Sequence, residues 1–384
     1  MNKIELIATT PFGLESVVAR EIKQLGYEEI TVDIGKVTFA GDEKAICRSN
    51  LWLRTADRVL VKMGEFQATT FEELFEQTKA LAWENWLPED AAFPVEGRSV
   101  KSMLSSVPAC QGIVKKAIVE KLKETYKREW FDETGPQYSI EVSIHKDVAT
   151  LTIDTSGAGL HKRGYRKLSA EAPLKETLAA AIVLLSRWTP DRPLYDPFCG
   201  SGTIPIEAAM IGKNIAPGLQ REFDAQFWPT IHEKLWQEAE DEAFDLANNQ
   251  QELSIFGSDI DSNAIAMAQT HANIAGLKHD IRWQVQPVSN LQLDQKYGCL
   301  IGNPPYGERL GEMREIEALY RQFGSIIKTS VDPTWSVFIL TSHPEFERLF
   351  GKRSDKKRKL YNGRIQCNLY QYFGPFPPRG SKNS

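Results

Sequence analysis

The chain has 384 residues, which corresponds to two or three domains of roughly 150 residues each. Its 42% apolar and 25% charged content is ordinary for a globular protein, and no run approaches the ~18 apolar residues that span a membrane. The five cysteines are scattered and form no C-x-x-C pair. We therefore expect a reduced, cytoplasmic protein with neither a membrane segment nor a structural metal site.

The net charge of −5 is unevenly distributed along the chain. Residues 341–384 contain ten Lys or Arg and three Asp or Glu, whereas residues 217–252 contain two basic and nine acidic side chains. A polyanionic partner would therefore bind a local basic patch rather than the whole surface. We expect the acidic stretch to be a helical insertion that packs over the core.

The first 65 residues predict a small β-α-β-β unit followed by a helix. Residues 3–9 alternate as a strand, and strands at 30–34 and 37–39 meet at a tight Gly35-Lys36 turn. Asp42 predicts the N-cap of the helix that follows.

Residues 66–157 continue with short strands and helices. Thr70 followed by Glu73 predicts an N-terminal capping box. Gly97 predicts a bend between two short extended segments. The strands and helices of this part are expected at 58–66, 70–82, 107–126, 138–145 and 148–155. No catalytic constellation is visible in residues 1–157.

Gly157-Ala158-Gly159-Leu160 predicts a linker, after which strand and helix patterns alternate. Strands are expected at 194–196, 254–259, 281–285, 298–303 and 335–341. Two more, at 358–361 and 364–373, flank Asn362-Gly363, the strongest short hairpin signal. This alternation predicts an α/β fold, a doubly wound parallel sheet that ends in an antiparallel hairpin.

Asp196-Pro197-Phe198-Cys199-Gly200-Ser201-Gly202-Thr203 follows the first of these strands and opens a helix, where ligands of open α/β sheets bind. Gly200 and Gly202 allow a ligand to lie close to the backbone. Pro205 occupies the third glycine position of G-x-G-x-x-G, and no Gly-Lys-Ser/Thr follows, which disfavours dinucleotides and nucleoside triphosphates. Asp196 would repel phosphates but accept from an ammonium group, so a positively charged aminoacyl ligand fits best. The alternative is a glycine-rich turn without a ligand.

Gly257-Ser258-Asp259-Ile260-Asp261 ends the second strand. A carboxylate at this point is placed to hydrogen-bond a ribose diol. We assign that role to Asp259, with Ile260 against an adenine, and expect Asp261 to cap the next helix.

Asn303-Pro304-Pro305-Tyr306 closes the fourth strand. Two prolines at a strand end prevent further ladder hydrogen bonds and stiffen the backbone. The Asn303 amide and the following carbonyl are then fixed acceptors beside an aromatic face. This combination suits the exocyclic amine of a flat base whose ring stacks on Tyr306. The alternative is a strand that ends in a polar turn.

These three motifs, in this order, resemble those of class I S-adenosylmethionine-dependent methyltransferases that modify amino groups. Other segments resemble the bacterial 23S rRNA guanine-N2 methyltransferases, which include the N-terminal half of the bifunctional large-subunit enzyme. These segments are 161–166, 172–177, 303–310 and 359–364. Phe93-Pro94-Val95 and Pro108-Ala109-Cys110-Gln111 resemble parts of the ferredoxin-like segment and THUMP RNA-binding domain of those enzymes. The resemblance covers nearly the whole chain.

The resemblance implies a ferredoxin-like segment at 1–65, a THUMP domain at 66–157 and a Rossmann-like methyltransferase domain at 158–384. The implied cofactor is S-adenosylmethionine. Its contacts would come from Asp196, Phe198, Gly200, Gly202, Thr203, Asp259 and Ile260. Many relatives carry an Asp after the third strand that accepts from the adenine amine, and here Gln286 is the nearest residue. The catalytic pocket for the base would be formed by Asn303, Pro304 and Tyr306.

The implied reaction is N2-methylation of a guanine in 23S rRNA or a large-subunit precursor, by direct transfer of the methyl group to the exocyclic amine. We expect phosphate contacts from Lys115, Lys116, Arg163, Arg166, Lys356, Lys357, Arg358 and Lys359. Two other activities stay open, adenine-N6 methylation and guanine-N2 methylation of tRNA. An RNA-binding or ribosome-assembly factor without activity is a third alternative.

Cys199 and Cys299 lie in apolar runs with no His nearby in the sequence. We therefore expect buried structural thiols rather than nucleophiles. The histidines show no spacing typical of a metal site.

Overall fold

The computed structural model describes residues 3–167, 174–306 and 310–378, the last range without the side chains of 310–312. Two motif segments, 172–173 and 307–309, lie outside the described residues. The chain forms two compact units. Of the described residues, those within 1–10, 18–160 and 221–243 form unit 1, and those within 11–17, 161–220 and 244–384 form unit 2.

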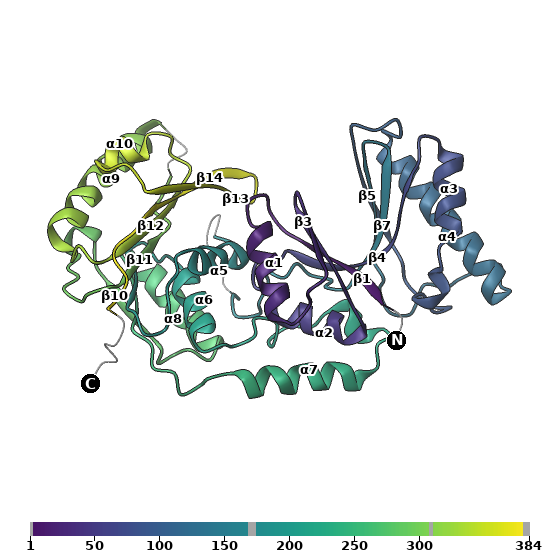
Figure 1. Ribbon diagram of the computed structural model, residues 1–384, viewed down its shortest axis with the longest axis horizontal. Coiled ribbons are helices and arrows are strands. Elements are labelled where there is room, and N and C mark those ends of the chain that lie inside the picture. Colours follow the sequence, from purple (N-terminus) through teal and green to yellow (C-terminus); the bar gives the residue numbers. More distant parts are fainter. Residues whose placement is uncertain (1–2, 168–173, 307–309, 379–384) are drawn as a thin grey trace. The chain divides into compact units, whose positions relative to one another are not determined.

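Unit 1 is built on a single seven-stranded sheet with the order β2-β3-β1-β4-β7-β6-β5 (Figure 1). Its strands are β1 (Ile4–Thr9), β2 (Ile30–Asp33), β3 (Lys36–Gly41), β4 (Arg58–Gln67), β5 (Val95–Val100), β6 (Ile140–His145) and β7 (Val148–Asp154). Neighbouring strands are antiparallel except β5 and β6, which are parallel. The pairing of β4 with β7 joins the ferredoxin-like and THUMP-like segments of the sequence into this one sheet.

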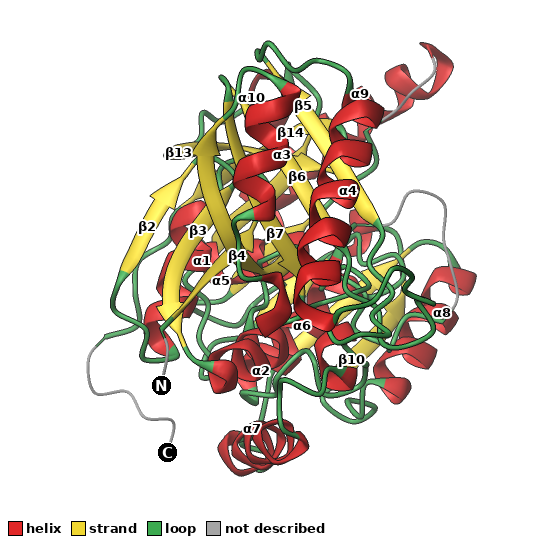
Figure 2. Ribbon diagram, turned by 90° about the vertical axis from the view of Figure 1, so that its right-hand side faces the viewer, coloured by secondary structure: helices red, strands yellow, loops and turns green. Residues whose placement is uncertain are grey.

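Helices cover the sheet of unit 1, and α3 and α4 lie side by side in front of its strands in Figure 2. The helices of this part of the chain are α1 (Glu15–Gln24), α2 (Glu43–Trp52), α3 (Phe71–Lys79), η1 (Trp83–Asn85), α4 (Val107–Tyr126), η2 (Asp224–Phe227) and α7 (Glu233–Leu246). Both predicted N-caps are confirmed. The Asp42 side chain accepts from the N–H of Ala45, and Thr70 and Glu73 form the reciprocal capping box.

The predicted bend at Gly97 is wrong, because β5 continues through this residue as a regular strand. A Cβ atom at position 97 would lie 3.0 Å from Gln111 and 3.3 Å from Val107, both on α4, and 3.2 Å from Val142 on β6. The glycine therefore allows α4 to pack closely on the strand, which is a tertiary requirement that its neighbours in the sequence do not reveal.

The acidic insertion is helical, as expected, and residues 221–243 of it belong to unit 1. The guanidinium of Arg48 donates to both carboxylate oxygens of Glu242, at 2.8 and 2.7 Å, and Lys44 pairs with Glu238 at 3.1 Å. These pairs connect α7 to α2. Part of the local negative charge is thus paired inside the unit.

Aromatic rings fix the start of the insertion. The Trp228 ring stacks on Tyr138 with a centroid separation of 4.4 Å, and its Nε1–H donates to the Gln137 carbonyl at 2.9 Å. Phe223 stacks on Trp236 at 5.5 Å. The Arg221 guanidinium donates to several carbonyls of residues 156–159. The insertion therefore holds the end of the THUMP-like segment as well as α2.

Unit 2 is a three-layered α/β structure on a second seven-stranded sheet, β10-β9-β8-β11-β12-β14-β13. Its strands are β8 (Leu194–Asp196), β9 (Ile255–Asp259), β10 (Ile281–Val285), β11 (Cys299–Gly302), β12 (Ser336–Thr341), β13 (Lys356–Asn362) and β14 (Ile365–Tyr372). Strands β10, β9, β8, β11 and β12 are parallel to one another. Strand β14 is antiparallel to both of its neighbours, β12 and β13. The doubly wound sheet with its C-terminal hairpin is therefore confirmed.

Two apolar clusters occupy the two faces of this sheet. One contains residues of α5 (Glu176–Leu185), α6 (Thr203–Gly212) and α8 (Ser262–Ile274), and the other contains residues of η3 (Val288–Asn290), α9 (Leu310–Ser330) and α10 (Phe346–Phe350). The central strands are apolar on both faces, as parallel strands between helices require. No helix in the described ranges is both long and apolar enough to cross a membrane.

Replacing Trp228 by Ala should lower the free energy of unfolding of unit 1 by about 3–5 kcal/mol, because the change removes a buried aromatic side chain and its hydrogen bond. Urea unfolding followed by circular dichroism measures this loss. The neighbouring Phe227 is 59% exposed, so Phe227→Ala is the control and should change stability by at most about 0.5 kcal/mol. Equal effects of both changes would contradict the proposed role of the Trp228 stack.

Candidate functional site

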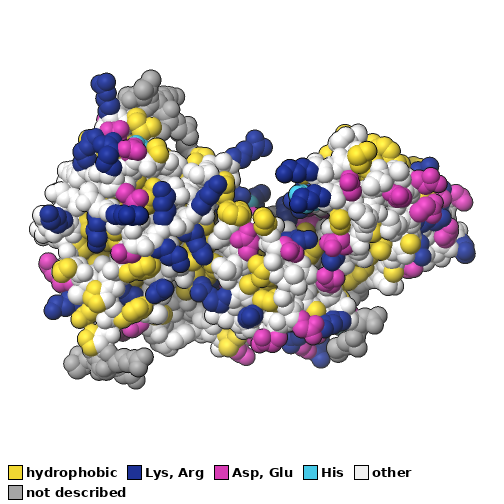
Figure 3. Space-filling model, turned by 45° about the horizontal axis from the view of Figure 1, so that its top comes forward, with side chains coloured by type: hydrophobic (Ala, Val, Ile, Leu, Met, Phe, Trp, Pro, Cys, Tyr) yellow, Lys and Arg dark blue, Asp and Glu magenta, His cyan; other side chains and the backbone are white. Residues whose placement is uncertain are grey.

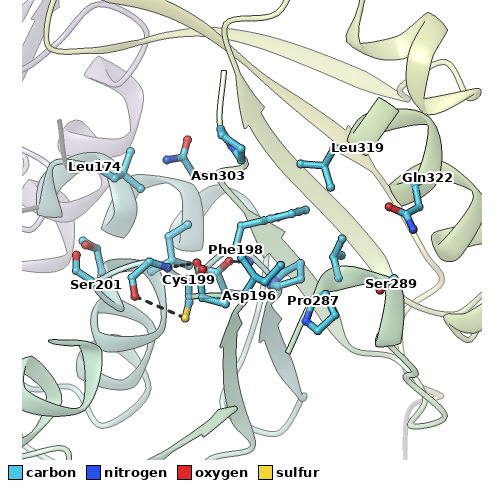
Figure 4. A pocket seen from close by; sticks show the side chains of 18 residues that line it. Leu174, Asp196, Phe198, Cys199, Ser201, Pro287, Ser289, Asn303, Leu319 and Gln322 are labelled. Atoms are coloured by element: carbon cyan, nitrogen blue, oxygen red, sulfur yellow. Dashed lines mark hydrogen bonds between the residues drawn. The ribbon is translucent and has the colours of Figure 1, made fainter. Parts of the chain in front are cut away.

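A cavity of about 530 Å³ lies at the carboxyl ends of the parallel strands of unit 2. It opens where the strand order reverses between β8 and β11, the position at which open α/β sheets bind ligands. Its volume lies in the usual range for small-molecule sites. Asp196 ends β8, and Asn303 comes directly after the neighbouring strand β11. Figure 4 shows both side chains at the same cavity.

The turn after β8 forms the floor of the cavity. Asp196 is buried, and its carboxylate accepts from the N–H of Phe198 at 3.0 Å. Gly200 lines the cavity with φ +49°, and a Cβ atom there would meet nothing within 4 Å. Open space beside a positive-φ glycine is what a ligand that approaches the backbone needs.

Asp259 and Ile260 form the next part of the wall. One Asp259 oxygen accepts from the N–H of Gly200 and the other from the N–H of Asp261, both at 3.0 Å. A carboxylate oxygen has two lone pairs, so these bonds leave acceptor capacity for a ribose hydroxyl. Ile260 is 73% exposed at the cavity, and Asp261 caps α8 as predicted.

Gly202 and Thr203 differ in what they do. Gly202 has φ +85°, and a Cβ atom there would lie 2.7 Å from Trp283 and 2.9 Å from Ala268. A glycine is therefore required at position 202 by the backbone conformation and by the packing of Trp283 and Ala268. Gly202 is not among the residues that line the cavity. Thr203 does line the cavity and accepts a hydrogen bond from Arg166.

Arg166 is half-buried and contacts Thr203, which follows the turn after β8. Its guanidinium pairs with Glu176 at 3.3 Å, donates to the Leu174 carbonyl at 3.0 Å and donates to Thr203. Leu174 and Thr203 both line the cavity. The RNA contact predicted for Arg166 does not fit this position, because the side chain is occupied in supporting the cavity wall.

Arg163 is 3% exposed, so the RNA contact predicted for it does not fit the structure either. Its guanidinium pairs with Glu207 at 3.4 Å, and the hydroxyl of Tyr165 donates to the same carboxylate at 3.1 Å. A buried arginine is stable only when it is paired in this way. The sequence 161–166 looks basic, yet the structure turns both of its arginines inward.

Gln286 is not among the residues that line the cavity. Its side-chain amide donates to the hydroxyl of Tyr195 at 2.6 Å, and its backbone N–H donates to the Asp259 carbonyl at 2.9 Å. The Gln286 side chain therefore points toward Tyr195 of β8. The predicted contact of its carbonyl with an adenine amine is not supported by this orientation.

The loop after β11 brings Asn303 and Pro305 to the cavity, whereas Pro304 is buried and is not part of the lining. The ring of Tyr306 packs against the α5–α6–α8 cluster, and its hydroxyl donates to the side-chain oxygen of Asn303. Burial raises the pKa of Tyr306, so the hydroxyl stays protonated. In this conformation the ring faces inward rather than toward a base.

The remaining predicted RNA contacts fall into two groups. The Lys115 ammonium donates to the Phe93 carbonyl at 2.9 Å and pairs with Glu133 at 2.6 Å, so it serves the packing of α4, whereas Lys116 is exposed. On β13, strand alternation divides the basic run between two faces. Lys357 lies over the Tyr370 ring and Lys359 over Tyr361. The exposed lysines of this strand are Lys356, Lys357 and Lys359, and Arg358 is half-buried.

Both cysteines singled out in the sequence are buried. Burial raises the pKa of Cys199 and raises that of Cys299 to about 11, so neither is a thiolate at neutral pH. No group of three or more His, Cys, Asp or Glu side chains in the described part of the chain could hold a metal ion.

The cavity also contains residues that sequence reasoning missed. Ser289 follows β10, and Leu319 and Gln322 come from α9, more than ten residues beyond the Asn303 loop (Figure 4). Helical residues with no local motif carry no signal of this kind in one sequence. A polar η3 turn after a predicted parallel strand was the signal that could have found Ser289.

The residues of the cavity fit S-adenosylmethionine. Asp196 offers a carboxylate to the cationic end of the cofactor, and Gly200 leaves room beside the backbone. Asp259 has acceptor capacity for the ribose, and Ile260 exposes an apolar surface for the adenine. The fold and this site are those of a class I S-adenosylmethionine-dependent methyltransferase.

Comparison with known protein families identifies the family within this class to which the chain belongs. Residues 163–371 match the family described as "RMKL-like, methyltransferase domain", residues 5–60 match the "RlmL ferredoxin-like domain", and residues 68–154 match the "THUMP domain". The first match covers more than half of the chain. The protein belongs to the RMKL-like methyltransferase family.

Full-length relatives agree with this assignment. The chain is 52% identical over 384 residues to "Putative RNA methyltransferase YpsC" of Bacillus subtilis, and the match covers 100% of this chain and 99% of the relative. It is 35% identical to "Ribosomal RNA large subunit methyltransferase K/L" of Syntrophotalea carbinolica, over 96% of this chain and 53% of that protein. The chain thus spans about half of the longer relative.

Two solved structures are similar over nearly the whole chain. "SMU.472, a putative methyltransferase complexed with SAH" has a TM-score of 0.93 and 45% identity, and covers 98% of this chain and 100% of its own. A protein of Listeria monocytogenes described as "a predicted N6-adenine-specific DNA methylase" has a TM-score of 0.93 and 55% identity, with coverage of 98% and 97%.

Cofactor affinity should depend on the titration of Asp196. Burial raises the pKa of Asp196 well above its ordinary value, with the Phe198 N–H opposing and the Asp259 charge adding to the shift. Its contribution to stability is thus present at low pH and is lost as pH rises through the raised pKa. A cationic cofactor requires the carboxylate, so affinity should tighten as pH rises, by at most about tenfold per pH unit.

Calorimetric titration of S-adenosylmethionine from pH 5 to pH 8 measures this dependence. In Asp196→Asn, affinity should be weaker and nearly independent of pH, because the amide cannot ionise. Equal affinities of the two proteins throughout this range would contradict the contact.

Proposed function

We propose that the protein transfers the methyl group of S-adenosylmethionine to the exocyclic N2 amine of a guanine in 23S rRNA. One observation carries the proposal: Asn303 lines the same cavity as Asp196 and Asp259. The amine acceptor and the carboxylates expected to hold the cofactor therefore face one space. The THUMP match and the relative named for large-subunit ribosomal RNA support RNA as substrate. We place the reaction in the cytoplasm, where bacterial ribosomal RNA resides.

The proposed catalysis depends on positioning and electrostatics rather than on a covalent enzyme intermediate. S-adenosylmethionine, when bound, would supply an electrophilic methyl group and leave as the neutral thioether S-adenosylhomocysteine, and the methylated amine would release one proton to solvent. The lone pair of guanine N2 is delocalised into the ring, so this amine is a poor nucleophile. The Asn303 side-chain oxygen and the Pro304 carbonyl would accept from its N–H groups and favour a more pyramidal, more nucleophilic nitrogen.

Entry of the base requires Tyr306 to change its contacts. In the structure the Tyr306 hydroxyl uses one of the two lone pairs of the Asn303 oxygen that would accept from the amine. We propose that the ring leaves its inward position when a base enters, which frees this lone pair and presents an aromatic face for stacking. A paired base would first have to leave its helix, or lie in an open loop.

The RNA backbone would contact exposed lysines. Figure 3 shows many Lys and Arg side chains on the face of unit 2 that is toward the viewer, on the left of the picture. We propose Lys357 and Lys359 on β13, together with Lys356 and with Lys116 on α4, as phosphate contacts. Affinity for RNA should accordingly weaken as salt concentration rises.

Asn303→Ala should reduce methyl transfer by about 100-fold or more, because it removes a fixed acceptor from the site where the amine must be held. Affinity for S-adenosylmethionine should stay within about twofold of wild type. Single-turnover transfer of labelled methyl groups and calorimetry measure the two quantities. Asn273→Ala, at an exposed asparagine of α8, is the matched control. Near wild-type turnover of the Asn303 variant would refute the mechanism.

Tyr306→Phe keeps the ring and removes the hydroxyl that competes for Asn303, so its kcat/KM for RNA should equal or exceed that of the wild type. Tyr306→Ala also removes the stacking face, worth ~1–3 kcal/mol per base, and should lower kcat/KM roughly 5- to 150-fold. Steady-state kinetics with the unmethylated substrate RNA distinguish the two. If the Phe variant is as impaired as the Ala variant, the hydroxyl rather than the ring matters.

The substrate itself is tested with a deletion strain. Mass spectrometry of nucleosides from its rRNA and tRNA should show loss of N2-methylguanosine from 23S rRNA alone. Adenine-N6 methylation, of RNA or DNA, is the second candidate, because Asn-Pro-Pro-Tyr serves either amine and a 55% identical solved structure is described as "a predicted N6-adenine-specific DNA methylase". Loss of N6-methyladenosine would select that alternative, and loss from tRNA would select a tRNA substrate.

A further inference from the structure

The loop that contains Asn303 is held from behind by a buried tyrosine. Tyr320 of α9 is 0% exposed, and its hydroxyl donates to the Pro305 carbonyl at 2.8 Å. The same hydroxyl lies 2.9 Å from the Thr341 hydroxyl, at the carboxyl end of β12. The Thr341 oxygen in turn accepts from the backbone N–H of His343 at 3.1 Å.

The direction of each hydrogen bond follows from the number of protons available. A carbonyl can only accept, so the single proton of Tyr320 goes to Pro305. The proton between Tyr320 and Thr341 must then come from Thr341, which accepts the His343 N–H on its own oxygen. A directed chain therefore runs from the His343 N–H through Thr341 and Tyr320 to Pro305.

Packing prevents the Tyr320 ring from moving away. Phe346 and His343 contact it edge-on, with centroid separations of 5.1 and 5.6 Å. Burial raises the pKa of Tyr320 to about 12, so its hydroxyl remains a donor over the physiological range. Such a rigid donor can fix the position of the carbonyl that it contacts.

The loop needs an anchor of this kind because prolines supply no N–H groups. β11 ends at Gly302, and residues 304 and 305 cannot donate to a neighbouring strand. The Tyr306 hydroxyl, which bonds Asn303, is lost as a tether when the ring leaves its inward position. The contact of Tyr320 with Pro305 does not involve the atoms proposed to bind the base.

We propose that Tyr320 is a positioning residue for methyl transfer: its hydroxyl fixes the Pro305 carbonyl and thereby holds Asn303 at the cavity. This inference rests on the proposed transfer at Asn303, and it holds for guanine and adenine alike. It concerns the placement of the reacting amine, so it predicts an effect on turnover rather than on cofactor binding.

Tyr320→Phe removes one hydroxyl, and Tyr372→Phe is the matched control. The Tyr372 hydroxyl is also buried in unit 2 and donates to a carbonyl, that of Lys352 at 3.1 Å, but Tyr372 does not line the cavity. Both variants should lose similar thermal stability. Only Tyr320→Phe should lower kcat, by about 10- to 100-fold, with the dissociation constant of S-adenosylmethionine changed less than about twofold.

Thr341 provides a graded test of the same chain. Thr341→Ser keeps the hydroxyl and should retain wild-type kcat, whereas Thr341→Val removes the donor to Tyr320 and should lower kcat less than Tyr320→Phe does. A kcat of Tyr320→Phe within twofold of that of Tyr372→Phe would overturn the proposal. So would equal kcat values for Thr341→Ser and Thr341→Val.

Hydrogen exchange separates failure of this inference from failure of the proposed function. The amides of Asn303 and Tyr306 should exchange faster in Tyr320→Phe than in Tyr372→Phe, a difference that needs no RNA substrate. Faster exchange together with inactivity of the wild type on every RNA tested would reject the proposed function but not the anchor. Unchanged exchange in this loop would reject the anchor itself.

Discussion

One carboxylate, that of Asp259, holds together the loops on which the cavity depends. The two carboxylate oxygens accept from the N–H of Gly200 in the turn after β8 and from the N–H of Asp261 at the start of α8. The backbone carbonyl of the same residue accepts from the N–H of Gln286 after β10. Three strand ends therefore meet at one residue. Charged acceptors form stronger hydrogen bonds than neutral ones, and this geometry aligns the turns before any ligand binds. A cofactor then finds a preorganised wall.

The wall is supported from behind by buried ion pairs. Arg166 links Leu174 and Thr203, which both line the cavity, and the neighbouring Arg163 is paired with Glu207. Buried pairs of this kind stabilise little by themselves, because desolvation offsets much of the attraction. Their value is in fixing which surfaces face the cavity. Arg163 and Arg166 are thus part of the framework of the cavity wall.

The acidic insertion shows the same principle in unit 1. Its negative side chains pair with Arg48 and Lys44 of α2, and Trp228 stacks on Tyr138. A stretch that appears in the sequence as an interruption between α6 and β9 thereby becomes part of another compact unit. The local charge in the sequence indicated an unusual segment, but long-range contacts determined that it packs on α2 and Tyr138 of unit 1.

The sequence by itself determined the class of the protein. Apolar strand patterns, the glycine turn after β8 and three helix caps are local properties, and they predicted features that the structure contains. The tertiary structure alone decided which side chains face the cavity: Gln286 and Tyr306 point inward to the protein, and Leu319 and Gln322 reach the cavity from a distant helix. The physical reason is that a local pattern sets backbone conformation, whereas the direction of a long polar side chain depends on partners that only folding brings within hydrogen-bond distance.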